Sequence, residues 1–105
     1  MTFPSNVKLL STPRLIEGGR SQGNFRNFNL ALHVRDKQSS VMANRELLNK
    51  HYDLPSNPKW INQTHSNICI DASSIFSLID ADASYSSKPG VVCGILTADC
   101  LPVFV

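Results

Sequence analysis

Two side chains in this sequence have the chemistry to act together at a reactive centre. His65 lies in Gln63-Thr64-His65-Ser66, and Cys100 lies in Thr97-Ala98-Asp99-Cys100-Leu101-Pro102. Each follows a β-like run, where side chains can leave a sheet edge and enter a pocket. The pair could therefore act as metal ligands or as a nucleophile with its base. On residue type alone, a cysteine beside an apolar run is more often a small core residue, and a loop histidine is more often structural or solvated.

A zinc site needs more ligands than this pair supplies. Zinc takes three protein ligands in catalytic sites and four in structural ones. The further histidines are His33 and His51, and His51 is expected to be exposed at the end of a helix. Asp99, next to Cys100, could orient a ligand or simply end a strand.

Residues 12–27 are rich in glycine, serine, arginine and asparagine, which predicts a functional loop. Within it, Gly18-Gly19-Arg20-Ser21 could bind an anion through backbone amides and the Arg20 side chain. The segment matches neither the dinucleotide-binding nor the P-loop pattern, so a simple turn is the alternative.

The elements that must position these residues alternate irregularly. Residues 28–34 alternate apolar with polar or small side chains, which predicts a half-buried strand. A helix is predicted over about residues 41–52, with Ser39-Ser40 as its N-cap, an i,i+4 pair of Glu46 with Lys50, and an end before Pro55. Its apolar stripe consists of Val41, Leu47, Leu48 and Tyr52.

The second half of the chain is mostly β-like. Residues 59–65 and 67–71 are short β-like runs, and residues 86–90 are predicted to form a turn. The pattern of residues 91–97 predicts a strand buried on both faces. Cys69 and Cys93 are expected in the core, and Trp60 is expected to be a packing anchor. The predicted fold class is α+β, a mixed β-sheet flanked by helices.

Composition excludes several classes of protein. The formal net charge of +2 is weak and scattered, so nothing indicates a nucleic-acid partner. Neither a signal peptide nor a long apolar span is visible, which argues against a membrane partner. Three cysteines without a CxxC pair favour reduced thiols in a cytoplasmic protein. The apolar ending Val103-Phe104-Val105, within an apparent strand, predicts a truncated chain.

Several motifs resemble those of the YfiH-like, or laccase-domain, family. Trp60-Ile61-Asn62-Gln63-Thr64-His65 is similar to the family's W-L-x-Q-V-H-G block, and Ala81-Asp82-Ala83 followed by Pro89-Gly90 and the segment 97–102 is similar to its A-D-A…P-G…T-A-D-C-L-P signature. Asn44-Arg45 matches the end of its E-N-R motif, and residues 18–34 resemble its G-G-V-S…S-L-N-L segment. The resemblance implies that residues 1–105 are the N-terminal portion of a single YfiH-like laccase domain, a layered α/β sandwich.

The resemblance implies a zinc-dependent purine nucleoside phosphorylase with adenosine deaminase as a second activity. It implies that His65 and Cys100 are zinc ligands and catalytic residues, and that Asn29 and Arg45 lie near the substrate. The family's third ligand, from an H-A-G-W-R-G motif, has no counterpart in this sequence. The implied partners are a purine nucleoside and phosphate. One departure from the family pattern is Ser66, which replaces the glycine after the ligand histidine and is expected to alter the turn.

Other functions remain open from the sequence. A His₂Cys set is compatible with copper, so a copper-dependent polyphenol oxidoreductase is one alternative, although a laccase needs many more histidines than the three present. An inactive truncated remnant or a binding module is another. A Cys–His hydrolase, with Cys100 as the thiolate and His65 as its base, is the last.

Overall fold

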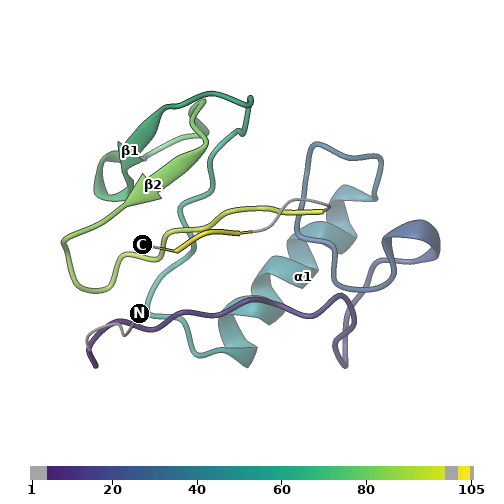
Figure 1. Cartoon of the computed structure of the whole chain (residues 1–105). Helices are drawn as coiled ribbons and strands as arrows, with labels where there is room; N and C mark the ends of the chain where they lie inside the picture. The colour runs from purple at the N-terminus through teal and green to yellow at the C-terminus, as the bar shows by residue number, and fades with distance from the viewer. Residues whose placement is uncertain (1–4, 99–101, 105) are drawn as a thin grey trace. The chain divides into compact units, whose positions relative to one another are not determined.

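The structure, a computed structural model, describes residues 5–98 and 102–104 and combines an α-helix with short strands. The elements follow in the order given by a 3-10 turn at Gly23–Phe25, helix α1 at Gln38–His51, strand β1 at Cys69–Asp71, a 3-10 turn at Ala72–Ser74 and strand β2 at Ala83–Tyr85 (Figure 1). Within the described residues, no helix has the length and apolar character required to cross a membrane.

The chain forms two compact units, one up to Asn44 and one from Arg45 onward. The boundary falls within α1. That residues 1–105 belong to a single laccase-type domain stays a prediction.

Helix α1 begins at Gln38 rather than at about Val41. The Lys37 carbonyl accepts the first bonds, from the amides of Ser40 (3.0 Å) and Val41 (3.1 Å). Ser39 and Ser40 therefore lie inside the first turn, and the prediction that they cap the helix is wrong. The predicted end before Pro55 is confirmed, because the helix stops at His51 and Asp53 has a left-handed φ of 51°.

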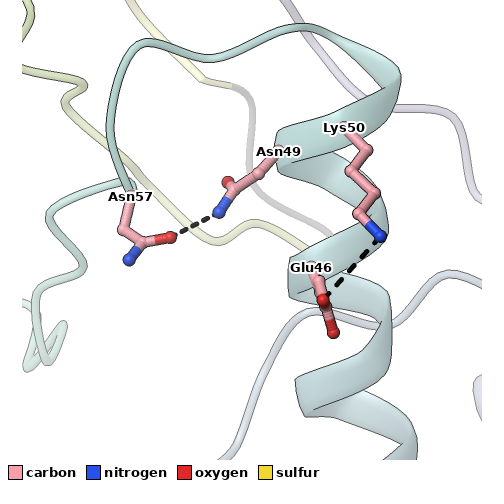
Figure 2. A network of polar contacts seen from close by, with 4 residues as sticks. All are labelled: Glu46, Asn49, Lys50 and Asn57. Atoms are coloured by element: carbon pink, nitrogen blue, oxygen red, sulfur yellow. Dashed lines mark hydrogen bonds and ion pairs between the residues drawn. The ribbon is translucent and has the colours of Figure 1, made fainter.

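The predicted polar pair on α1 is confirmed. The Lys50 ammonium lies 3.9 Å from a Glu46 carboxylate oxygen (Figure 2), and the two side chains are 77% and 73% exposed. A pair this exposed contributes only about 0.3 kcal/mol. The neighbouring Asn49 amide donates to the Asn57 side-chain oxygen, which ties the last turns of the helix to the loop that follows.

The side of α1 opposite these polar residues supplies buried apolar side chains. Val41 and Leu48 are almost fully buried, and Leu47 and Tyr52 are half-buried. The predicted apolar stripe is therefore confirmed, and its most deeply buried members, Val41 and Leu48, are seven residues, or about two turns, apart.

Residues 28–34 in the first unit do not form a strand, so that prediction is wrong. The Asn29 side chain accepts from the Ala31 amide (3.1 Å) and donates to the Ala31 carbonyl (3.2 Å), which closes a local turn. Asparagine side chains that bond nearby backbone compete with strand ladders in this way. The alternation predicts burial only in its first half, because Phe28 and Leu30 are buried but Leu32 is 43% exposed.

The second unit is organised by parallel pairing. Strands β1 and β2 are parallel, with Cys69 opposite Ala83 and Asp71 opposite Tyr85. Further parallel bridges join Lys59 to Cys93 and Asn62 to Asp80. The core of this unit consists of Ile61, Ala72, Ile75 and Ala81, with Ile70 and Val91 packed against it. The β-like run predicted at residues 67–71 is confirmed at its end, and the predicted turn at residues 86–90 is confirmed at Pro89-Gly90.

Residues 91–97 are not a strand buried on both faces, which corrects a second prediction. Cys93 forms one isolated bridge and is exposed, and Ile95 is 41% exposed. Cys69 is also exposed, so the expectation that both cysteines lie in the core is wrong. A run of apolar residues indicates β structure, but its burial depends on whether strands lie on both sides of it.

Candidate functional site around His65

His65 lies on an exposed loop between two paired segments of the second unit. Its backbone has a left-handed φ of 60°, a conformation that costs a residue with a side chain about 1 kcal/mol. Among the described residues, none makes a hydrogen bond to its imidazole ring. The exposed ring is therefore available to a ligand, while the backbone beneath it must be held by other groups.

The carboxylate of Asp82 holds this loop. Oδ2 of Asp82 accepts from the amides of Thr64 (3.2 Å) and Ser66 (2.6 Å), and Oδ1 accepts from the His65 amide (3.0 Å). The Ser66 hydroxyl donates a fourth bond to Oδ2 (2.6 Å). Three successive backbone donors thus converge on one side chain.

These bonds favour the ionised carboxylate. The Ser66 hydroxyl, followed by the loop amides, lowers the pKa of Asp82 to about 2. Asp82 therefore carries a full negative charge beneath the His65 loop at neutral pH.

Backbone pairing fixes Asp82 on both sides. The Ala81 amide donates to the Asn62 carbonyl (3.1 Å), and the amides of Asp82 (3.0 Å) and Ala83 (3.2 Å) donate to the Ile68 carbonyl. Asn62 and Ile68 are the residues that flank the His65 loop. The two ends of the loop are therefore bound to the same short segment that carries the Asp82 side chain.

A second contact links the His65 loop to the segment that leads toward Cys100. The Gln63 side chain donates to the Leu96 carbonyl (2.9 Å) and accepts from the Leu96 amide (3.0 Å). The side-chain amide of Gln63 thereby satisfies both backbone polar groups of Leu96, as a neighbouring strand would. Leu96 precedes Cys100 by four residues, a span of at most about 14 Å of extended chain.

Trp60 is confirmed as a packing anchor. A Cβ built on Gly94 would lie 2.8 Å from the Trp60 ring, so only glycine allows this close approach. The Arg45 guanidinium carbon lies 4.8 Å from the centroid of the Trp60 ring, within the range of a cation–π contact. Burial lowers the pKa of Arg45.

Cys100 and Asp99 lie outside the described residues. Within residues 5–98 and 102–104, no group of three or more His, Cys, Asp or Glu side chains is close enough to hold a metal ion. His33 and His51 are exposed, as was expected for His51. The assignment of His65 and Cys100 as ligands stays a prediction.

Asn29 belongs to a polar network in the first unit. Its side chain donates to Asp36 (3.0 Å), which also accepts from the Ser21 hydroxyl (2.5 Å). Burial acts to raise the pKa of Asp36, but the bonds from Ser21, Asn29 and the Lys37 amide outweigh it and leave that pKa below its ordinary value. The Asn29 amide is thus engaged within the protein, and its place near a substrate stays a prediction.

Asn44 is the centre of the same network and is fully buried. Its Nδ2 donates to the Ser21 hydroxyl (2.9 Å) and to the carbonyls of Asn29 (2.9 Å) and Asn27 (3.3 Å). Its Oδ1 accepts from the Arg20 amide (2.8 Å). The adjacent residues Asn44 and Arg45 of the Asn-Arg motif therefore make different contacts: the first organises a loop and the second contacts Trp60.

The predicted anion site at Gly18-Gly19-Arg20-Ser21 is contradicted in its backbone part. The Gly19 amide donates to the Ile16 carbonyl (3.1 Å), the Arg20 amide to Asn44, and the Ser21 amide to the Asn27 carbonyl (3.0 Å). Amides engaged in this way cannot bind an anion. Gly18, with a φ of 89°, forms the simple turn that was the alternative.

Sequence reasoning missed Asp82 and Gln63 as individual residues. Both lie in motifs that carry the family resemblance, the A-D-A segment and the Q-x-H block. The sequence signal that could have found them is a charged or amide side chain within a family motif and next to a β-like run. Only the structure shows that these two side chains bind backbone.

The fold and this site define a small α+β unit in which a histidine loop is held against a parallel strand pair. The family model described as multi-copper polyphenol oxidoreductase laccase matches residues 10–105, and the chain belongs to that family. A crystal structure of a Neisseria meningitidis protein of family DUF152 is similar, with a TM-score of 0.72 and 38% identity, over 79% of this chain and 34% of that one. The predicted α+β class and the family resemblance are confirmed.

Curated relatives in this family match most of the chain. The purine nucleoside phosphorylase of Haemophilus influenzae is 42% identical over 100 residues, which are 95% of this chain and 40% of the relative. The purine nucleoside phosphorylase YfiH of Escherichia coli K12 is 39% identical over 101 residues, which are 95% of this chain and 41% of the relative. The chain thus spans about 40% of the length of these relatives.

Proposed function

We propose that this chain is part of a zinc-dependent purine nucleoside phosphorylase with adenosine deaminase as a second activity. The names of the relatives from Haemophilus influenzae and Escherichia coli support the first activity. The observation that carries the proposal is the loop of His65, in which the imidazole is exposed and three backbone amides and the Ser66 hydroxyl donate to Asp82.

The donor set fits zinc. An imidazole nitrogen and a thiolate are ligands that zinc prefers, and the imidazole of His65 makes no bond to another described residue. His65 and Cys100 would hold the ion, and the Gln63 side chain binds the backbone of Leu96, four residues before Cys100 in the sequence. When bound, zinc would polarise phosphate or lower the pKa of a water molecule to about 7.

The other residues of the proposed site would bind the substrate. Arg45 keeps its positive charge at neutral pH and has its guanidinium over the Trp60 ring, so it is suited to phosphate or to the nucleoside. Asn29 is proposed as a second substrate residue. The proposed partners are therefore a purine nucleoside and phosphate, and the proposed location is the cytoplasm.

The test uses the protein as the gene encodes it. Base release from inosine and adenosine is measured with and without phosphate, together with ammonia release from adenosine, for the wild type and for His65→Ala and Cys100→Ala. We expect both variants to lose base release and stoichiometric zinc. Full activity in Cys100→Ala would contradict the proposed metal site.

A copper-dependent polyphenol oxidoreductase is the second candidate, because the matching family model carries that description. A Cys–His hydrolase and an inactive remnant are the remaining hypotheses. Metal analysis after purification without added metal separates them: zinc supports the phosphorylase, copper with phenol oxidation supports the oxidoreductase, and metal-free protein with amide hydrolysis supports the hydrolase. Metal-free protein without any of these activities supports a remnant or a binding module.

A further inference from the structure

The His65 loop contains a feature that the ligand assignment leaves unexplained. Residues 63–67 connect two backbone segments that pair with residues 79–83, so the loop begins and ends on the same strand-like segment. A loop anchored only at its ends would leave the amides of Thr64, His65 and Ser66 to water. Instead, all three point at the Asp82 carboxylate.

We propose that Asp82 is a positioning residue for His65: its carboxylate binds three successive loop amides and so fixes the orientation in which the imidazole meets the metal. The role rests on the proposed zinc site. Asp82 acts through the loop and not on the imidazole itself, since its oxygens are engaged by the three amides and by the Ser66 hydroxyl.

Two observations support positioning over general stabilisation. First, the bonds come from His65, the residue with the left-handed φ, and from its two neighbours, and a strained backbone persists only where its surroundings hold it. Second, Asp82 has no freedom to follow the loop, because its own amide and those of Ala81 and Ala83 are bound to Ile68 and Asn62. A carboxylate fixed in this way binds the loop in one arrangement of His65 rather than several.

Ser66 strengthens the same arrangement. Its hydroxyl donates to Asp82 and accepts from the Ile68 amide (3.3 Å), so it joins the carboxylate to the residue that precedes β1. The residue that departs from the family's glycine thus adds a bond to the turn that it was expected to disturb.

The variant Asp82→Asn tests the proposal in the protein as the gene encodes it. It keeps the size of the side chain but places an amide donor where an oxygen faces loop amides. The matched control is Asp80→Asn, which makes the same chemical change two residues away. Among the described residues, the exposed Asp80 carboxylate accepts only from the Asn62 side chain (2.8 Å). Circular dichroism shows whether each variant folds.

Zinc affinity, measured by competition with a chromophoric chelator, is the main readout. Changes to groups that orient a metal ligand typically lower metal affinity 10- to 100-fold, so we expect a loss of at least about tenfold in Asp82→Asn and less than about twofold in Asp80→Asn. The absorption spectrum of the cobalt-substituted protein should change in Asp82→Asn alone. Amide exchange of the metal-free protein should become faster at residues 64–66 and stay unchanged in α1.

The outcomes separate this proposal from the proposed function. Wild-type protein that binds no zinc overturns the metal site and, with it, the role toward the metal. Wild-type protein that binds zinc, with Asp82→Asn binding it equally well, overturns the positioning role alone. If Asp82→Asn does not fold, Ser66→Ala decides: it removes one of the four bonds, so we expect about a threefold loss of affinity, and an unchanged affinity overturns the proposal.

Discussion

The buried side chain of Asn44 allows a sharp test of what organises the first unit. Asn44→Ala removes an amide that makes four hydrogen bonds and is fully buried. Two partners keep another bond, because the Ser21 hydroxyl still donates to Asp36 and the Asn27 carbonyl still accepts from the Ser21 amide. The Arg20 amide and the Asn29 carbonyl keep no hydrogen bond to another described residue.

The magnitude follows from these two groups. An unsatisfied buried donor or acceptor costs about 1–3 kcal/mol, and water can reach these two groups in part, because Arg20 is exposed and Asn29 is half-buried. We therefore expect Asn44→Ala to lower the free energy of unfolding by about 2–3 kcal/mol, a large share of the stability of a small domain.

Asn49→Ala is the matched control. It makes the same substitution in the same helix, so the change in helix propensity cancels, but it removes only the exposed contact with Asn57 (Figure 2). We expect a loss of about 0.5 kcal/mol, as for an ordinary exposed hydrogen bond.

Urea unfolding followed by circular dichroism measures both variants in the protein as the gene encodes it. Amide exchange at Arg20, whose amide donates to Asn44, gives a local readout. Equal losses of stability in Asn44→Ala and Asn49→Ala, with unchanged exchange at Arg20, would refute the reasoning.

Three further predictions concern the second unit and the chain as a whole. The pKa of Asp82 is lowered from 3.8 to about 2, so the stabilisation that its carboxylate gives the His65 loop is complete above about pH 4 and is lost as the pH falls toward 2. The amide chemical shifts of His65 and Ser66, followed by NMR, should therefore titrate near pH 2, and a midpoint near 4 would contradict this. Gly94→Ala places a Cβ 2.8 Å from the Trp60 ring and should cost about 1–3 kcal/mol with a changed fluorescence of Trp60, whereas an unaltered spectrum and stability would show that the ring moves freely. The 105-residue polypeptide produced alone should be poorly soluble and inactive, because it supplies only two of the proposed zinc ligands, His65 and Cys100. A soluble, zinc-loaded, active preparation would disprove this.

The sequence by itself determined the elements whose signals are local. The 3.6-residue spacing of Val41, Leu48 and Tyr52 placed α1, and Pro55 limited its end. The glycine-rich turn at Gly18 and the i,i+4 pair of Glu46 with Lys50 also depend only on near neighbours. The motifs in the second half identified the family, because they combine several unusual residues at fixed spacing.

Tertiary structure alone decided what depends on residues far apart in the chain. The apolar alternation at residues 28–34 predicted a strand, but the Asn29 side chain satisfied the backbone locally and no strand formed. The apolar run at residues 91–97 could not reveal its own exposure, since burial requires neighbours that the run does not encode. Asp82 illustrates the same limit at the site: its type was visible in the sequence, but its bonds to a loop 16–18 residues earlier exist only because parallel pairing brings the two segments together.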